Sequence, residues 1–365
     1  MRTVVVAGAR GVVGSAVVDR LLERGDCHVV ALSRREPDLA AAPTPGRYRH
    51  VPVDLRDAQA AAAVAGSLGG ATHLVYAALY EKPGLVGGWT ERDQMLVNDA
   101  MFRNLLDPLS EAAAGLEHVS VLQGTKAYGA HLHPIPVPAR ERAARDDHEN
   151  FYFRQEDHLR EVAGRAGFAW TVLRPQVILG GALGVAMNLV PVIGAYAAIC
   201  RAEGLPFAFP GGRPYVWEAV DARLCAMALE WAADAPAARG QIFNLTNGDV
   251  FEWHDLWPSI ADALGVEPAG DLRRELATFM PEHAGTWDRI VEEQGLRRLS
   301  LAQVLGESHH YADLCFNLAE LDEVFPRFVS TVKIRQAGFH PCFDTEDTLR
   351  HWFNVLAVRN VLPSP

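Results

Sequence analysis

A glycine-rich turn near the start of the chain constrains the fold more than any other feature. The apolar run Val4–Ala7 has the length and composition of a buried parallel strand. It is followed by GARGVVG, in which three glycines stand three residues apart, and by an apolar-periodic segment over Ser15–Glu23 that predicts a helix. A second apolar run, Val29–Leu32, completes a βαβ unit. This order of elements is typical of a site that holds a pyrophosphate at a helix N-terminus.

Each glycine of the turn has a steric role in such a dinucleotide site. Gly8 allows the tight turn, Gly11 lets the backbone approach the phosphates, and Gly14 lets the helix pack close to the strand. We expect Val12 and Val13, at the start of the helix, to join the coenzyme site. The G-x-x-G-x-x-G spacing resembles that of the short-chain dehydrogenase/reductase superfamily.

The end of the second strand indicates which coenzyme binds. That strand ends in Ser33, Arg34 and Arg35. A carboxylate here would accept a hydrogen bond from a ribose 2′-hydroxyl, whereas guanidinium groups suit a 2′-phosphate. The sequence therefore predicts NADPH rather than NADH. The competing interpretation is a glycine-rich turn in an unrelated fold, with the arginines at a solvated strand end.

Size, charge and cysteine usage exclude several kinds of protein. The 365 residues fit one large α/β unit with an appended lobe, and the formal charge of −11 argues against nucleic acid or an anionic membrane as the main partner. There is no apolar run of about 18 residues and the N-terminus is already a strand, so we expect neither a membrane span nor a signal peptide. The five scattered cysteines and the histidines lack metal-ligand spacing, which predicts free thiols, no metal and a cytoplasmic location.

Strands and helices alternate through the N-terminal half, which predicts a Rossmann-type doubly wound parallel sheet. Further strands are expected at Tyr48–Val53, His73–Ala77, His118–Gln123, Trp170–Arg174 and Gln241–Leu245. Helices are expected at Ala58–Gly66, Arg92–Ala114, Gln155–Gly167 and Ala222–Ala232.

The alternation stops after residue 175, which predicts a second lobe. The Rossmann domain would comprise residues 1–175 and about 216–247, and a smaller, mostly helical substrate-binding lobe would comprise about 176–215 and 248–365. The substrate would bind in the cleft beyond the carboxyl ends of the strands. The long segment 131–149, rich in proline and charge, is typical of a lid or a binding loop.

Three further strand ends complete the predicted coenzyme site. Asp54 and Leu55 follow the third strand, beside the expected adenine, Ala77 and Ala78 follow the fourth, and Gln123 ends the fifth. Asp54 could also cap the next helix, and the two roles are compatible.

The chain lacks the Tyr-x-x-x-Lys pair that short-chain reductases carry on one helix. In that pair the lysine holds the nicotinamide ribose and favours the tyrosinate. Here Tyr152 opens the helix that should follow the fifth strand, and Lys126 lies just past the end of that strand. Both residues would therefore face one cleft.

The segments LQGTKAYG and ENFYFRQEDHL, which carry Lys126 and Tyr152, resemble motifs of the progesterone 5β-reductase/iridoid synthase-like (PRISE) enzymes. WTVLRPQVILG, VWEAVDARLCAMALEWAAD, FNLTNGDVFEWHDLWP and WDRIVEEQGL resemble further family segments in family order, so the resemblance covers essentially the whole chain. It implies an NADPH-dependent ene-reductase that adds hydride 1,4 to an enone or enal. Tyr152 would stabilise the enolate oxygen, and Lys126 would keep the phenol acidic and hold the coenzyme or Tyr152 in place.

The sequence is also compatible with other functions. The same residues would serve an NADPH-dependent carbonyl reductase or an epimerase-like relative, and a non-catalytic NADP(H) sensor is a third alternative. Tyr80, Tyr128 and Phe153 are candidates for the substrate pocket, although aromatic residues at such positions are more often core. The segment after the fourth strand and the 129–150 loop depart from the plant pattern, so no physiological substrate is implied. A homodimer is expected only by analogy with the superfamily.

Overall fold

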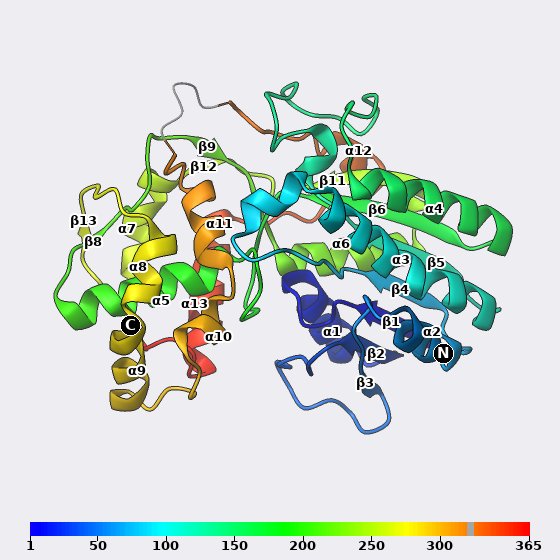
Figure 1. The fold of residues 1–365 in the computed structure, drawn as a ribbon, viewed down its shortest axis with the longest axis horizontal. Helices are drawn as coiled ribbons and strands as arrows, with labels where there is room; N and C mark the ends of the chain where they lie inside the picture. Colours follow the sequence, from blue (N-terminus) through cyan, green and yellow to red (C-terminus); the bar gives the residue numbers. More distant parts are fainter. Residues whose placement is uncertain (320–324) are drawn as a thin grey trace.

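A seven-stranded parallel sheet forms the centre of one part of the molecule (Figure 1). The computed structural model describes residues 1–319 and 325–365. The strands, in spatial order, are β11 (Gln241–Leu245), β6 (Ala169–Pro175), β5 (His118–Leu122), β4 (His73–Tyr76), β1 (Arg2–Ala7), β2 (Cys27–Ser33) and β3 (Tyr48–Pro52). All neighbouring strands pair in parallel, which confirms the expected fold class. The strand order reverses between β1 and β4, as at the ligand crevice of a doubly wound sheet.

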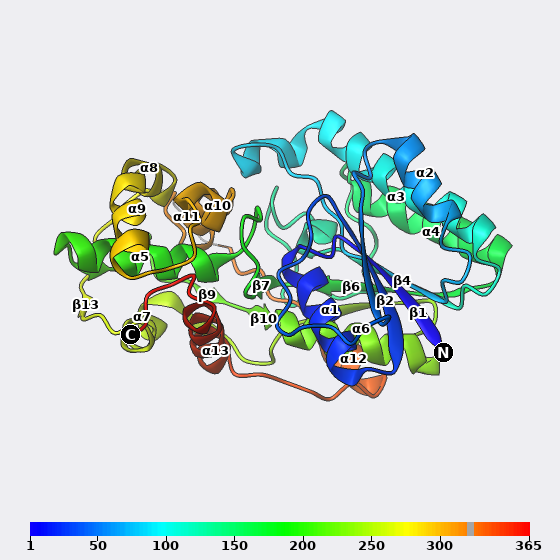
Figure 2. The ribbon, with the colours of Figure 1, turned by 90° about the horizontal axis from the view of Figure 1, so that it is seen from below.

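Helices cover both faces of the sheet, as Figure 2 shows from the side. One face carries α1 (Val12–Arg24) and α6 (Ala222–Asp234), and the other carries α2 (Ala58–Gly66), α3 (Arg92–Ala112) and α4 (Phe151–Ala166). The alternation of side chains along β1 explains the two layers. Val4 and Val6 pack into the core under α1 and α6, whereas Val5 and Ala7 pack under α2, α3 and α4.

Helix α4 begins four residues earlier than the sequence pattern indicated. Its cap is Asn150, whose side-chain oxygen accepts a 3.0 Å hydrogen bond from the Tyr152 N–H. Capping by asparagine satisfies an otherwise free N–H and fixes the start of the helix. As a result Tyr152 lies in the first turn of α4.

All but one of the remaining described helices form a second lobe beside the sheet (Figure 1). They are α5 (Leu189–Glu203), α7 (Trp253–Ala263), α8 (Leu276–Glu282), α9 (Ala284–Glu293), α10 (Leu301–Leu305), α11 (Ser308–Cys315) and α13 (Thr345–Val358). Helix α5 is buried from Leu189 to Cys200 and forms the core of this lobe. None of the described helices is long and apolar enough to cross a membrane.

Short elements connect the two parts of the chain. The strand pairs are β7 (Val177–Leu179) with β10 (Ala219–Asp221), β8 (Phe207–Ala208) with β13 (Pro268–Ala269), and β9 (Val216–Trp217) with β12 (Phe251–Glu252). The 3₁₀ turns are η1 (Leu85–Thr90), η2 (Thr125–Tyr128) and η3 (Pro236–Ala238).

The chain returns to the sheet once more near its C-terminal end. Helix α12 (Val332–Gln336) packs on β11, where the Lys333 Nζ donates a 2.9 Å hydrogen bond to the Ile242 carbonyl oxygen. A parallel bridge also joins Ala139 to Val329. This stretch lies within the segment assigned to the substrate-binding lobe by sequence, and the boundaries of the two domains stay a prediction.

Polar contacts bridge the lobes, and two of them lie near the carboxyl edge of the sheet. Asp38, in the segment after β2, pairs with Arg297 of the helical lobe. Farther along the same edge, the Gly84 N–H donates a 2.9 Å hydrogen bond to a carboxylate oxygen of Glu307.

Candidate active site

A cavity of about 650 Å³ lies along the carboxyl edge of the sheet, where the sheet meets the helical lobe. Gly8, Ser33, Ala77 and Gln123, which end or follow four different strands, line its sheet side, and Tyr311 of α11 is part of its opposite wall. This volume is in the range of small-molecule sites. Its position at the reversal of strand order is where doubly wound sheets bind ligands.

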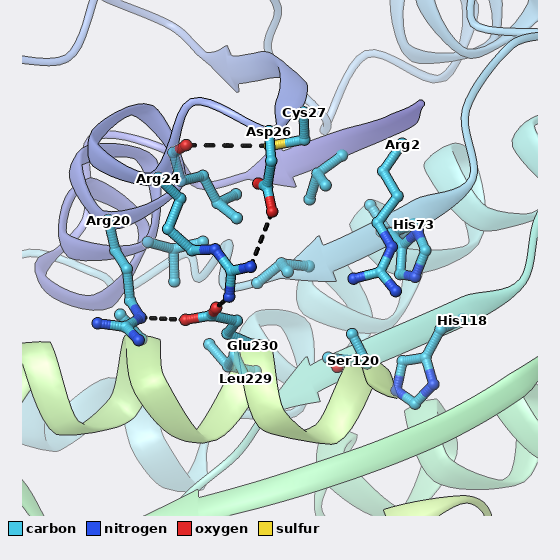
Figure 3. Close-up of a pocket in the computed structure, with 17 residues that line it drawn as sticks. Arg2, Arg20, Arg24, Asp26, Cys27, His73, His118, Ser120, Leu229 and Glu230 are labelled. Atoms are coloured by element: carbon cyan, nitrogen blue, oxygen red, sulfur yellow. Dashed lines mark hydrogen bonds and ion pairs between the residues drawn. The ribbon is translucent and has the colours of Figure 1, made fainter. Parts of the chain in front are cut away.

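A second pocket, drawn in Figure 3, lies at the opposite edge of the sheet and is much smaller. Its volume is about 40 Å³, and its charged groups already have partners. Arg20 and Arg24 both pair with Glu230, and Arg24 also pairs with Asp26. A space of this size with satisfied charges leaves the larger cavity as the candidate active site.

The glycine-rich turn forms one end of the large cavity. Gly8 has a φ of 80°, and a Cβ atom there would stand 2.6 Å from the backbone of Ala77, so only glycine fits. A Cβ at Gly14 would overlap the Gly8 carbonyl oxygen, so Gly14 acts through packing and does not line the cavity. Gly11, Val12 and Val13 line the cavity at the N-terminus of α1, where free N–H groups favour an anion.

Arginines gather at the end of β2. Arg34 and Arg35 line the cavity together with Ser33, as the sequence predicted. Arg10, within the glycine-rich turn, joins them: burial lowers the pKa of its guanidinium, and the nearby charge of Arg35 contributes. Among the described residues, the buried Nε of Arg10 has no hydrogen-bond partner. Arg10 was not predicted from the sequence. Its position inside the glycine-rich turn is the signal that could have identified it as a coenzyme-binding residue.

The other predicted coenzyme residues, Asp54, Leu55, Ala77, Ala78 and Gln123, all line the cavity. Asp54 pairs with Arg56 at 2.6 Å. The cap of α2 is instead Asp57, which accepts a 3.0 Å hydrogen bond from the Ala60 N–H.

Tyr152 is buried in the wall of the cavity with 5% of its surface exposed. Its hydroxyl reaches the ends of β5 and β6, since a Cβ at Gly124 would stand 3.6 Å from the hydroxyl oxygen. Burial raises the pKa of the Tyr152 phenol, the negative charge of Glu81 raises it further, and Arg174 opposes the rise. Tyr152 is therefore a neutral phenol at ordinary pH.

Lys126 lies in η2 and lines the same cavity. Its Nζ is 3.3 Å from Oε1 of Glu81 and 4.3 Å from the centre of the Trp89 ring. Burial lowers the pKa of Lys126, and the charge of Glu81 opposes the fall. The sequence predicted that Lys126 lowers the pKa of the Tyr152 phenol. In the structure the pKa of Tyr152 is raised.

The Asn150 side chain forms hydrogen bonds with the backbone of both Tyr152 and Lys126. Asn150 accepts from the Tyr152 N–H through its side-chain oxygen and donates a 3.0 Å hydrogen bond through Nδ2 to the Lys126 carbonyl oxygen. Tyr152 and Lys126, 26 positions apart in sequence, are thereby held at one place. The sequence motifs did not indicate Asn150, Glu81 or Trp89. Of these residues, only Asn150 had a signal in the sequence, because asparagine directly before a helix indicates a cap.

Only one of the three candidate substrate-pocket residues lines the cavity. Tyr80 lines the cavity, whereas Tyr128 and Phe153 are absent from its described lining. The Tyr128 hydroxyl donates a 2.6 Å hydrogen bond to Asn244, and the Phe153 ring packs on His148. Both side chains have interior partners that turn them from the cavity.

Trp89, His131 and Tyr311 line the cavity as well, although the sequence did not indicate them. The Trp89 and His131 rings pack edge to face at 6.3 Å. Burial lowers the pKa of His131 to about 4, and the charge of Lys126 contributes. His131 is therefore neutral at ordinary pH, and it brings the 131–149 loop to the cavity.

The chain is similar to known proteins over most of its length. A family model described as NAD(P)H-binding matches residues 8–190. An (S)-8-oxocitronellyl enol synthase of Nepeta racemosa is 30% identical, with 98% of this chain and 91% of the relative covered. A Camptotheca acuminata enzyme of the same description is 32% identical over 82% of this chain and 79% of the relative. A short chain dehydrogenase of Penicillium aethiopicum is 30% identical over 81% and 83%.

Solved structures share the fold at low identity. A UDP-N-acetylglucosamine 4-epimerase from Methanobrevibacter ruminantium superposes with a TM-score of 0.68 at 16% identity, covering 98% of this chain and 99% of that one. The Bordetella bronchiseptica enzyme WbmH, in complex with NAD⁺, gives 0.66 at 16% identity and 98% coverage of both chains.

Proposed function

Because the chain belongs to the progesterone 5β-reductase/iridoid synthase-like family of short-chain dehydrogenases/reductases, we propose that it is an NADPH-dependent ene-reductase. The proposed reaction is 1,4-addition of hydride to the activated C=C bond of an enone or enal. The observation that carries the proposal is the meeting of Tyr152 and Lys126 in one cavity with the glycine-rich turn. As a family member, the chain is an oxidoreductase that uses a nicotinamide coenzyme.

The residues present fit a phosphorylated dinucleotide. Gly8 and Gly11 leave room for the backbone to approach a pyrophosphate at the start of α1. Arg34, Arg35 and the unpartnered Nε of Arg10 supply donors for a 2′-phosphate. When bound, NADPH supplies the hydride.

Tyr152 would bind the carbonyl oxygen of the substrate. As a neutral phenol it donates a hydrogen bond, and that bond strengthens as negative charge develops on the oxygen of the enolate. Burial of the phenol increases the effect because little water competes in the site. Lys126 assists by holding a coenzyme hydroxyl or the position of Tyr152.

The expected substrate is a small α,β-unsaturated ketone or aldehyde. The wall opposite the sheet includes Trp89, Met187 and Leu314, which suit an apolar carbon skeleton. The plant relatives are named for formation of (S)-8-oxocitronellyl enol. The product of such a step is an enol, as expected when hydride reaches the β-carbon before the α-carbon is protonated.

The test is NADPH consumption with a defined panel: 2-cyclohexen-1-one, progesterone, 8-oxogeranial and a saturated aldehyde, with products identified by mass spectrometry and NMR. Saturated ketones or aldehydes from the first three support 1,4-reduction. Allylic alcohols, or consumption with the saturated aldehyde alone, would identify a carbonyl reductase. Tight NADPH binding without consumption across the panel would identify a sensor. NADH, tested in parallel, measures the coenzyme preference.

A further inference from the structure

A buried carboxylate faces the candidate catalytic lysine, and nothing in the sequence motif points to it. The Glu81 side chain is 3% exposed, and its Oε1 lies 3.3 Å from the Lys126 Nζ. Glu81 belongs to the segment between β4 and η1, whereas Lys126 belongs to η2 after β5. The two residues therefore meet only because β4 and β5 are neighbours in the sheet.

Helix α3 holds the Glu81 segment through two buried amides one helical turn apart. Gln94 donates from Nε2 to the Glu81 carboxylate and accepts a 3.1 Å hydrogen bond from the Lys82 N–H. Asn98 accepts from the Tyr80 N–H and donates to the Tyr80 carbonyl oxygen, both at 2.9 Å. The backbone on both sides of Glu81 is thus fixed, which is more than a surface ion pair would require.

A glycine makes room for this arrangement. A Cβ atom at Gly88 would overlap the Gln94 side-chain oxygen, so any other residue at this position would displace the amide that binds Glu81. Trp89, the next residue, places its ring 4.3 Å from the Lys126 Nζ. One short turn therefore supplies both the space for Gln94 and an aromatic face for the ammonium.

Resting on the proposed function, we propose that Glu81 is a positioning residue that keeps buried Lys126 protonated and offsets its charge, so that Tyr152 works as a neutral hydrogen-bond donor. Transfer of an isolated ammonium out of water is costly, and such a group loses its proton instead. An adjacent carboxylate removes that tendency. The aromatic face of Trp89 adds to the attraction for the cation.

Side chains from several elements contribute to the charge balance around Tyr152. Lys126 from η2 and Arg174 from β6 are cationic, Glu81 is anionic, and Tyr311 from α11 and His131 from the 131–149 loop are neutral at ordinary pH. Arg174 is itself paired with Glu156. Lys126 and Arg174 are therefore each paired with a buried carboxylate, which offsets positive charge that would favour a tyrosinate.

This arrangement suits one direction of reaction. Reduction needs a donor at the substrate oxygen, which a neutral phenol provides, whereas oxidation of an alcohol needs a tyrosinate to accept the proton. Glu81 would thus bias the site toward reduction.

The test uses the scarcity of lysine in this chain, which has only Lys82, Lys126 and Lys333. In protein labelled with ¹³C at the lysine ε-carbon, three side-chain signals can be titrated with pH by NMR, with Lys126→Arg used for assignment. Coenzyme-free protein is used, so the result does not depend on any substrate. We expect Glu81→Gln, which keeps the shape and an acceptor for Gln94, to lower the titration midpoint of Lys126 by at least about one pH unit.

Glu91→Gln is the matched control. Glu91, which directly follows η1, is 50% exposed and pairs with Lys82, so this variant removes one nearby negative charge that is not paired with Lys126. It should leave the Lys126 midpoint unchanged, and Glu81→Asp should restore part of the shift. An unchanged Lys126 midpoint in Glu81→Gln overturns the proposal. A wild-type Lys126 that is already neutral at pH 7 also overturns the proposal, and this measurement does not depend on the folding of any variant.

The outcomes also separate this inference from the proposed function. Suppose that Glu81→Gln lowers the Lys126 titration midpoint as expected but the wild type does not reduce enones. The positioning role of Glu81 would then stand, and the proposed reaction would be rejected. If the wild type reduces enones but the Lys126 titration midpoint is unchanged in Glu81→Gln, the proposed reaction would stand and the positioning role of Glu81 would be rejected. In an active enzyme, the alkaline limb of the kcat/KM profile should move to lower pH in Glu81→Gln and stay in place in Glu91→Gln.

Discussion

The side-chain amide of Gln123, at the end of β5, donates a 3.1 Å hydrogen bond to the main-chain carbonyl oxygen of Tyr152, in the first turn of α4. The Gln123 oxygen accepts in turn from Arg174 Nε at 3.2 Å, and Arg174 pairs with Glu156 on α4. Three buried polar side chains therefore lock the start of α4 to the ends of two strands. This network and Asn150 fix the backbone of Tyr152 through its carbonyl oxygen and its N–H, independently of any substrate.

Tyr152→Phe should abolish most turnover while leaving coenzyme binding intact. The variant removes one hydrogen-bond donor to the developing enolate, and loss of such a donor costs about 10²–10³ in kcat. The backbone contacts of residue 152 do not involve the hydroxyl and should persist. Steady-state kinetics together with fluorescence titration of NADPH measure the two effects. Unchanged turnover would remove Tyr152 from the mechanism.

Replacing Arg34 and Arg35 together by alanine should weaken NADPH binding about 10- to 100-fold and change NADH binding little. Charge-assisted hydrogen bonds to a phosphate contribute about 1.5–3 kcal/mol, and NADH has no 2′-phosphate to lose them. Arg10→Ala should act in the same direction. Arg49→Ala, on exposed β3 and outside the described lining of the cavity, is the control that tests for a general charge effect. Equal losses for both coenzymes would contradict a 2′-phosphate site.

Gly14→Ala should destabilise the fold by about 1–3 kcal/mol, because the new Cβ overlaps the Gly8 carbonyl oxygen. Gly164→Ala is the matched control: Gly164 lies inside α4, and a Cβ there meets no atom within 4 Å. That change should stabilise the protein by about 0.5–1 kcal/mol. Denaturant unfolding of the three proteins measures both values. Equal stability of the two variants would show that α1 can shift away from β1.

His118 should make stability depend on pH between about 4 and 6.5. Burial lowers its pKa to about 4, so the unfolded chain, with a histidine pKa near 6.5, binds the proton more readily. The stability from this group is therefore complete above pH 6.5 and is lost as the pH falls toward 4. From pH 7 to pH 5 the loss is about 2 kcal/mol. His118→Phe should show a smaller loss in urea unfolding at the two pH values, and an identical slope would reject the assignment.

The sequence predicted the layered fold well, because buried parallel strands and amphipathic helices are local patterns. The sequence also indicated Tyr152 and Lys126, since Tyr152 lies at the start of a helix and Lys126 lies just after a strand, each in a recognisable segment. Glu81 was not, because its role depends on Gln94, Asn98 and the pairing of β4 with β5, which no local pattern encodes. Tyr128 and Phe153 were proposed from proximity in sequence, which does not tell on which side of a turn a ring will pack.

One compositional signal could have added weight to Lys126. Of 34 basic residues, only three are lysines. Arginine stays charged under all conditions in proteins, whereas a buried lysine can have its proton affinity adjusted by its surroundings. A lysine at the end of a central strand, in a chain that otherwise uses arginine, is therefore an informative choice.

Two of the polar contacts that join the lobes have a consequence for the binding and release of the coenzyme. Asp38–Arg297 stands beside the arginine end of the cavity, and Gly84–Glu307 stands beside Trp89 and Lys126. We expect a dinucleotide bound along the cavity to extend past both contacts, so that its release is easier when the lobes part. The Asp38–Arg297 pair is about 40% exposed on each side and is weakened by salt. We therefore expect the rate of coenzyme exchange, and with it any turnover limited by release, to rise with ionic strength.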